Sequence, residues 1–166
     1  MKKINILFFI SIFVISFFML NAISYAGISS SRFSIGGIKL GNNLNQVKKM
    51  YGQPKKIETE MKNSIHDGSK YELKTVFYGS SFKIHLMNGV VISVTSSGKN
   101  GIKTRDGIKV GDPEIRLADV YGQPSQSFSD NGVQMYVYEP NGENSSQFIF
   151  QIKNGKISEM TLTTSY

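Results

Sequence analysis

Two short stretches of the chain carry apolar residues at the spacing of an α-helix. The stripes are Leu40, Leu44, Val47 and Tyr51 in the first stretch, and Val110, Leu117, Val120 and Tyr121 in the second. Steps of three and four positions place most of these residues on one side of a helix. A glycine followed by Gln-Pro ends each stripe, as is typical of a helix end. The pattern predicts two short helices that need a sheet beneath them for stability.

The residues at the start of each stripe predict how the helices begin. Asn42 or Asn43 can cap the first helix by accepting a free backbone N–H. In the second stretch, Asp112 is suited to the cap and Pro113 to the first helical position. We therefore expect a side-chain cap at both helix starts.

After each helix the pattern changes to the alternation of β-strands. The expected strands are 70–78, 82–87 and 90–95 after the first helix, and 133–138, 148–153 and 156–162 after the second. Asn88-Gly89 and Asn154-Gly155 separate the last two strands of each set, and Asn-Gly between two alternating runs is a strong hairpin signal. We expect three antiparallel strands in each set.

The chain also repeats itself. Ile38-Lys39-Leu40-Gly41 returns as Ile108-Lys109-Val110-Gly111, and Tyr51-Gly52-Gln53-Pro54 returns as Tyr121-Gly122-Gln123-Pro124, both 70 positions later. Such a repeat decides the architecture. The predicted fold class is α+β, with two tandem repeats, each a short helix followed by a three-stranded antiparallel sheet, packed together as one body. The expected divisions are a first repeat at 27–98, a junction at 99–106 and a second repeat at 107–166.

The two copies differ at one core-like position of the helical stripe. Leu44 of the first copy aligns with Glu114 of the second, again 70 positions later. We expect the neighbouring Ile115 to supply the packing that Leu44 supplies in the first copy.

The order Gly-Ile-Lys-Leu-Gly, short helix, Tyr-Gly-Gln-Pro, aromatic strand and Asn-Gly hairpin resembles the repeat of the β-lactamase-inhibitor-protein-like superfamily. It is similar also to the unit of the small outer-membrane-assembly lipoproteins. The resemblance covers nearly all of 35–163 and implies helices on one face of an antiparallel sheet, tandem copies that form a curved surface, and protein binding without catalysis. It rests on structural motifs. These are Leu40/Gly41, Tyr51/Gly52, Pro54, Asn88/Gly89 and their second-copy equivalents.

The first 26 residues have the order of a secretory signal peptide. Lys2 and Lys3 precede an apolar run from Ile4 to Leu20, and Ser24-Tyr25-Ala26 offers a cleavage site after Ala26. An uncleaved membrane anchor is the alternative, because the run approaches the roughly 18 residues that a membrane helix needs. The chain has no cysteine, which excludes a lipoprotein and disulfides. We expect export to the periplasm or the cell exterior.

Charge is distributed unevenly along the chain. The formal net charge is +7, with nine lysines against four acidic residues in 37–98 and four basic against seven acidic residues in 107–166. Lys48, Lys49, Lys55 and Lys56 gather around the end of the first helix. For an exported protein, this cluster suggests anionic envelope polymer or lipid headgroups as a target and not nucleic acid. A solvated surface at a helix end that favours cations is the other interpretation.

Residues for catalysis are missing from the sequence. His66 and His85 are the only histidines, and neither has a companion at metal-ligand spacing. No serine lies in a nucleophile elbow, no glycine-rich stretch continues as a phosphate loop, and acidic residues are not paired. We therefore expect no enzyme activity, no catalytic or metal-binding residue and no cofactor.

Tyrosines are the best candidates for a binding surface. The alternation of the strands suggests that aromatic side chains lie on the sheet face away from the helices, where tyrosine can bury its ring against a partner. Tyrosine also has a high β-propensity, so an ordinary place in the sheet is the alternative. The residues proposed for partner binding are Tyr71, Tyr78, Tyr136 and Tyr138. The leading hypothesis is an exported, non-catalytic module that binds an unidentified protein in the envelope or outside the cell, inhibitor-like or envelope-assembly-like. A basic module that binds anionic polymer or lipid is the alternative.

Overall fold

The computed structural model describes residues 28–64, 67–142 and 145–164. The predicted signal peptide and His66 lie outside the described residues. Within them, no helix is long and apolar enough to cross a membrane.

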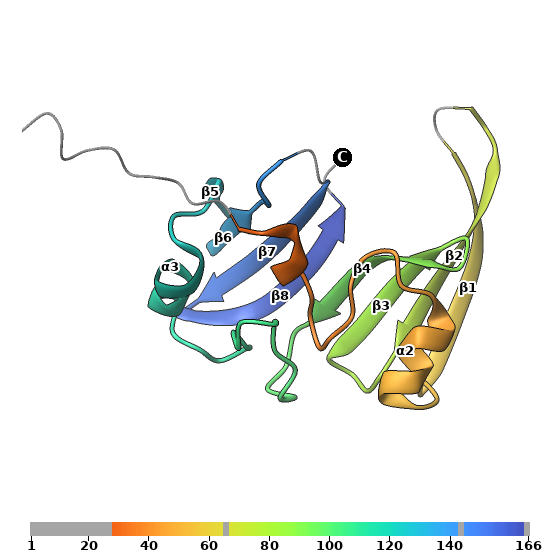
Figure 1. Cartoon of the computed structure of the whole chain (residues 1–166), viewed down its shortest axis with the longest axis horizontal. Helices are drawn as coiled ribbons and strands as arrows, with labels where there is room; N and C mark the ends of the chain where they lie inside the picture. The colour runs from red at the N-terminus through yellow and green to blue at the C-terminus, as the bar shows by residue number, and fades with distance from the viewer. Residues whose placement is uncertain (1–27, 65–66, 143–144, 165–166) are drawn as a thin grey trace, which may run out of the picture.

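One antiparallel sheet of eight strands forms the body of the molecule, in the order β1-β2-β3-β4-β8-β7-β6-β5 (Figure 1). The first half contains α2 (Leu44–Tyr51), β1 (Lys56–Asn63), β2 (Lys70–Phe77), β3 (Phe82–Met87) and β4 (Val90–Ser96). The second half contains α3 (Ile115–Tyr121), β5 (Gln126–Asp130), β6 (Val133–Tyr138), β7 (Ser146–Lys153) and β8 (Lys156–Thr164). A short 3-10 helix, η2 (Ser30–Arg32), precedes them. Strands β4 and β8 pair at the centre, so both halves belong to one sheet.

The predicted fold class is wrong in two respects. Each half has four strands where three were predicted, and the two predicted sheets are one continuous sheet. The additional strands, β1 and β5, are the two edges of the sheet, and every residue in them is exposed. Their side chains are mostly polar or charged, so they lack the apolar alternation that reveals a half-buried strand. A signal for β5 was present nonetheless, because Asn131-Gly132, both with positive φ, forms a third hairpin turn between β5 and β6.

The predicted Asn-Gly turns at Asn88-Gly89 and Asn154-Gly155 are confirmed. Asn88 and Gly89 have φ of 49° and 82°, and Asn154 and Gly155 have φ of 53° and 68°. Two successive residues with positive φ match the right-handed twist of the flanking strands. These turns join β3 to β4 and β7 to β8.

The helix starts differ from each other and in part from the prediction. Asn43 caps α2, because its side chain accepts from the Gln46 N–H at 3.0 Å while the Gln46 side chain accepts from the Asn43 N–H at 2.8 Å. The predicted cap at Asp112 is wrong, since α3 begins at Ile115 and has no side-chain cap. The Asp112 carboxylate instead accepts from the Lys109 N–H at 3.1 Å and pairs with Arg116 at 2.8 Å.

Both helices lie on one face of the sheet and share one core. Val47 of α2 and Leu117 of α3 are both buried in it. Central strands contribute Val94 and Leu162, which face each other across the β4–β8 pair. Because the buried side chains continue across that pair, the halves are stabilised by the same hydrophobic core.

The segment before α2 packs against the second half, although the sequence analysis assigned it to the first repeat. Ile28 pairs with Pro140, and the ring of Phe33 stacks on that of Phe148 with centroids 4.5 Å apart. Arg32 donates to the Asp106 carboxylate at 3.0 Å and to the Val120 carbonyl at 3.1 Å. From Ile28 the chain therefore lies first against the second half and then crosses to the first half before α2 (Figure 1).

Candidate binding face

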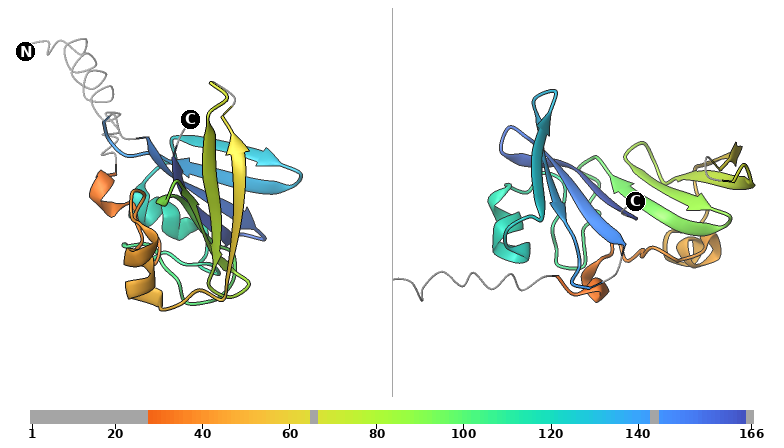
Figure 2. Two further views of the ribbon diagram at one scale, coloured as in Figure 1. Left: turned by 90° about the vertical axis from the view of Figure 1, so that its right-hand side faces the viewer. Right: turned by 90° about the horizontal axis from the view of Figure 1, so that it is seen from above.

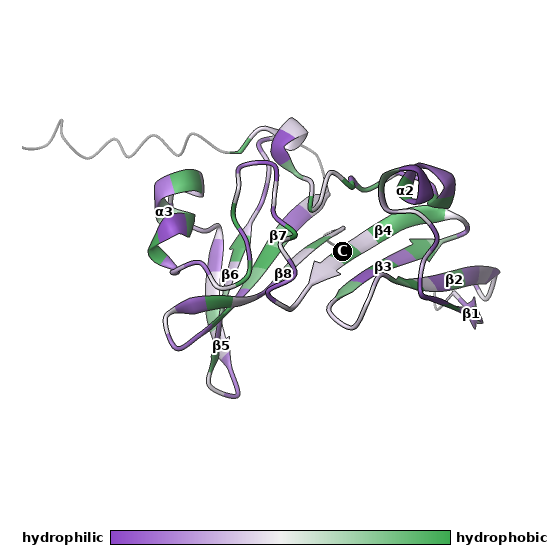
Figure 3. Ribbon diagram, turned by 90° about the horizontal axis from the view of Figure 1, so that it is seen from below, coloured by the Kyte–Doolittle hydropathy of each residue, from purple (hydrophilic) through white to green (hydrophobic). Residues whose placement is uncertain are grey.

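Both helices lie on one side of the sheet and leave its opposite face uncovered by helices (Figure 3). The strand register determines its side chains, because residues paired across neighbouring strands point to the same face. They are Lys56, Glu58, Glu60 and Lys62 from β1; Tyr71, Leu73, Thr75 and Phe77 from β2; Lys83, His85 and Met87 from β3; Ser93 and Thr95 from β4; Glu159, Thr161 and Thr163 from β8; Gln147, Ile149 and Gln151 from β7; Val133, Met135 and Val137 from β6; and Gln126, Phe128 and Asp130 from β5. We call this surface the open face.

The open face is hollow at its centre. Thr95, on the central strand β4, is only 5% exposed, although it lies on the face away from the helices. The two halves of the sheet are inclined to each other with the helices on the outer side of the bend (Figure 2). Strands near the middle are therefore shielded by the sheet on either side of them, and the open face is concave.

Hydroxyl groups occupy the middle of the open face. The Oγ1 atoms of Thr95 and Thr161 lie 3.1 Å apart, which links the two halves across the β4–β8 pair. On the first half, Thr75 Oγ1 lies 3.0 Å from His85 Nδ1. Burial, with a further effect of Lys83, lowers the pKa of His85 below its ordinary value. His85 is therefore neutral at pH 7 and takes part in a hydrogen-bonded network.

Apolar side chains flank this polar centre on both sides. Leu73 and Phe77 of β2 are half-buried, as are Met135 and Ile149 in the second half. Farther out, Phe128 is exposed. The sequence analysis did not select these residues, although the alternation along 71–77 placed Leu73 and Phe77 on one side. No cluster of three or more metal-ligating residues occurs in the described ranges.

Only one of the four predicted tyrosines lies on the open face. Tyr71 is there, but Tyr78, Tyr136 and Tyr138 point to the helix side. Tyr138 is buried, and its hydroxyl donates to the Gly122 carbonyl at 3.4 Å. Desolvation raises its pKa to about 12. The Tyr78 hydroxyl donates to the Gly52 carbonyl at 2.9 Å, so these two residues serve mainly in packing at the helix ends.

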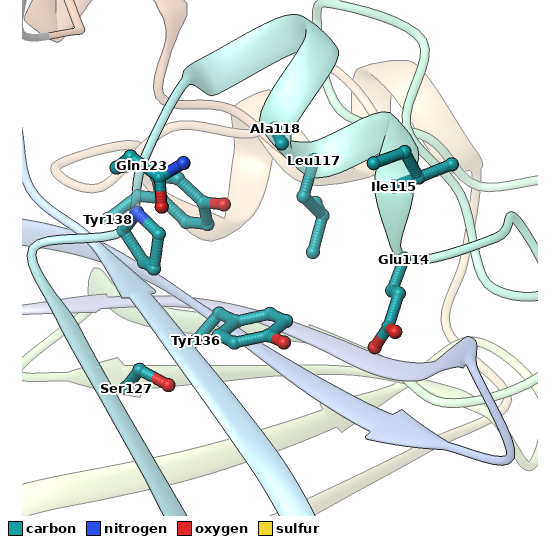
Figure 4. Close-up of a pocket in the computed structure, with 9 residues that line it drawn as sticks. Glu114, Ile115, Leu117, Ala118, Gln123, Ser127, Tyr136 and Tyr138 are labelled. Carbon is teal, nitrogen blue, oxygen red and sulfur yellow. The ribbon is translucent and has the colours of Figure 1, made fainter.

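Tyr136 has a different environment from the other tyrosines on the helix side. It is half-buried and lines a pocket of about 370 Å³ between α3 and strands β5 and β6 (Figure 4). Alternation along β6 could not reveal this, because both faces of the strand carry bulky residues. The pocket lies on the face of the sheet opposite the open face.

The predicted lysine cluster divides into two parts. Lys56 Nζ lies 2.5 Å from the Glu58 carboxylate and 5.9 Å from the centre of the Phe77 ring, so it belongs to the edge of the open face. The other three, Lys48, Lys49 and Lys55, surround the C-terminal end of α2 and make no ion pair with any described residue. Three of the four lysines therefore surround one helix end without an ion pair to any described residue.

No protein-family model and no curated protein matches the chain. Among solved structures, a cysteine-rich secretory protein from Staphylococcus aureus is similar over 84% of this chain and 49% of its own, with a TM-score of 0.53 and 14% identity. The uncharacterised protein YfeY from Escherichia coli has a TM-score of 0.47 and 15% identity, over 82% of this chain and 99% of its own. A DUF4309 family protein, YjgB, from Bacillus subtilis has a TM-score of 0.42 and 10% identity, over 75% of this chain and 79% of its own.

The chain spans about half the length of the staphylococcal protein. At 14% identity, this likeness shows a shared fold and nothing about a shared site.

Proposed function

We propose that this chain is an exported, non-catalytic protein-binding module and that the open face contacts the partner. The observation that carries the proposal is the concave surface formed by the whole sheet, with half-buried apolar side chains on both sides of a hydroxyl-lined centre. The resemblance to the β-lactamase-inhibitor-protein-like superfamily supports the same class of function. Export is proposed from the N-terminal sequence.

Physical properties of the open face suit binding to a folded protein. Protein interfaces are enriched in aromatic residues and methionine and have a polar rim, and the open face offers Phe77, Phe128 and Met135 beside charged edge residues. A hydrogen-bonded sheet is also rigid before binding, so little conformational entropy is lost when a partner docks. A convex protein surface fits this hollow better than an extended peptide, because the hollow spans strands from both halves.

Crosslinking capture from envelope extract tests the proposal. The purified protein should capture a discrete protein at low and at high salt. The double substitution L73S/F77S removes two apolar side chains of the open face and should abolish that capture. Met50→Ser is the matched control, because Met50 is an exposed apolar residue of α2 on the helix side. Circular dichroism and thermal unfolding establish that each variant is folded. Equal capture by L73S/F77S and the parent protein would contradict the proposal.

A second candidate function follows from the three lysines at the end of α2. Lys48, Lys49 and Lys55 present positive charge that the described residues do not neutralise. We propose binding to anionic envelope polymer or lipid headgroups as the alternative function. Retention on cell-wall polymer should then fall with ionic strength, because exposed charges are screened by salt. Retention of the triple variant K48Q/K49Q/K55Q at the parent level would exclude it.

A further inference from the structure

A pocket lies beside α3 in the second half, at positions where the first half carries different side chains. Strand pairing matches Ile57 and Val76 of the first half with Ser127 and Tyr136 of the second, since each pair lies directly across the first two strands after the helix. The helix position of Leu44 corresponds to Glu114. Leu44 packs against the core and Val76 is fully buried, while Ile57 on the edge strand is 39% exposed. In the second half, Ser127 and Glu114 replace the larger apolar side chains of Ile57 and Leu44 and leave space between the helix and the sheet.

The predicted compensation by Ile115 does not occur. Ile115 is 63% exposed and lies at the rim of the pocket, so it does not replace the side chain of Leu44. The space of about 370 Å³ therefore stays open between α3 and the sheet. Its lining residues are Glu114, Ile115, Leu117, Ala118, Gln123, Pro124, Ser127, Tyr136 and Tyr138. This volume lies within the roughly 300–1,000 Å³ that is typical of small-molecule sites.

Two polar groups in the pocket have no partner within the described residues. The Glu114 carboxylate makes no helix cap and no ion pair. The Tyr136 hydroxyl also makes no hydrogen bond there, whereas Tyr138 and Tyr78 donate to glycine carbonyls. Figure 4 shows the carboxylate and this hydroxyl at the same end of the pocket, with the ring of Tyr136 between α3 and the strands.

We propose that this pocket binds an organic ammonium ion carried on an apolar stem. The ammonium group would lie between the Glu114 carboxylate and the Tyr136 hydroxyl, both of which accept hydrogen bonds, and beside the electron-rich face of the Tyr136 ring. The stem would lie along Leu117 and Pro124. A carboxylate or phosphate ligand is disfavoured, because Glu114 would repel it and no cation lines the pocket.

Binding of 2-phenylethylammonium, followed by NMR titration, tests the proposal. The changes in chemical shift should be largest for the residues that line the pocket. The neutral analogue 2-phenylethanol and the anion 3-phenylpropionate have nearly the same stem and should bind at least about tenfold more weakly, because they lack the charge that Glu114 and the ring attract. A second arm uses Nα-acetyl-lysine N-methylamide. Tighter binding of the small amine identifies a free amine as the ligand, and tighter binding of the lysine derivative identifies a lysine side chain of a partner.

Three variants make the test specific. Glu114→Gln keeps the shape of the side chain and removes its charge, and it should weaken binding of the ammonium probe by about tenfold. Asp119→Asn removes one negative charge from α3 outside the pocket lining and should leave affinity unchanged. E114L/S127I introduces residues like those of the first half and should abolish binding.

Equal affinity of the parent protein and Glu114→Gln, or equal affinity for the ammonium ion and the alcohol, would overturn the proposal. Because the pocket and the open face lie on opposite sides of the sheet, this outcome leaves the capture experiment unaffected.

Discussion

The two halves of the sheet show how similar backbones can have different surfaces. In the first half, Leu44 packs against the core and Val76 is fully buried, while Ile57 on the edge strand stays 39% exposed; in the second half, Glu114, Tyr136 and Ser127 at the corresponding positions line a pocket. The strand pairing at these sites is the same in both halves. Three side-chain differences thus mark the half that has the candidate ligand site.

A second difference concerns how each half is held together. Two residues of the segment before α2 bind to the second half. The Phe33 ring stacks on Phe148, and the Arg32 guanidinium donates a hydrogen bond to the Asp106 carboxylate. The residue equivalent to Phe33 in the second copy, 70 positions later, is Lys103. Its side chain is exposed, so it does not supply a matching aromatic contact to the first half. The second half therefore depends on the segment that precedes the first, and the two halves are expected to unfold together.

Phe33→Ala should have the largest effect on stability. Removing a buried ring that stacks on Phe148 should lower the free energy of unfolding by about 3–5 kcal/mol. Lys103→Ala is the matched control and should change it by less than about 0.5 kcal/mol. Urea unfolding, monitored by circular dichroism, measures both. Similar losses for the two variants would show that the crossing segment has no special role in the second half.

Exchange of Leu44 and Ile57 for their second-half counterparts should have the next largest effect. L44E/I57S places the second-half residue types in the first half and should lower the free energy of unfolding by about 2–3 kcal/mol, since apolar burial is lost. The reverse exchange, E114L/S127I, should raise it by about 1 kcal/mol because apolar side chains fill a pocket. Urea unfolding of both variants measures the two changes. Destabilisation by E114L/S127I would mean that the second half cannot adopt the packing of the first.

The helix caps should contribute a smaller difference between the halves. Asn43→Ala removes the capping hydrogen bonds of α2 and should cost about 1 kcal/mol. Glu114→Gln, at the N-cap position of α3, removes no side-chain cap and should change stability by less than about 0.5 kcal/mol. Thermal unfolding of the two variants checks the difference. If both substitutions cost the same, the capping box does not distinguish the helices.

His85 should produce the smallest effect, and that effect depends on pH. Its pKa is lowered in the folded protein, so near pH 6 the unfolded chain binds more protons than the folded one. The free energy of unfolding should therefore fall as pH decreases from about 7 through the ordinary histidine pKa of about 6.5 and level off below the lowered value. His85→Gln should flatten this dependence, measured by urea unfolding at several pH values. His66→Gln is the control and should preserve the contribution of His85.

Local patterns in the sequence located many of the elements. The spacing of Leu44, Val47 and Tyr51 revealed α2, and two Asn-Gly pairs revealed the central hairpins, because helix periodicity and turn conformation depend on neighbouring residues. The same method missed β1 and β5. These edge strands are exposed along their whole length, so their hydrogen bonds to β2 and β6 are not accompanied by an apolar pattern.

The candidate sites could be predicted less well than the elements. Alternation along β6 separated Tyr136 and Tyr138 from Met135 and Val137, but both groups are bulky, and only packing decides which group faces the helices. The face assigned to these tyrosines was therefore wrong. The clustering of the lysines was easier to predict, because they are close in sequence around one helix end.

The sequence by itself determined the two short helices, the Asn-Gly hairpins, the similarity of the two halves and the lack of cysteine chemistry, because each depends on residues that are close together in the chain. Tertiary structure decided the pairing of β4 with β8, the crossing of Phe33 to Phe148, the concave open face and the pocket at Glu114. These features depend on contacts between residues that are far apart in sequence, and on whether one side chain fills the space left by another.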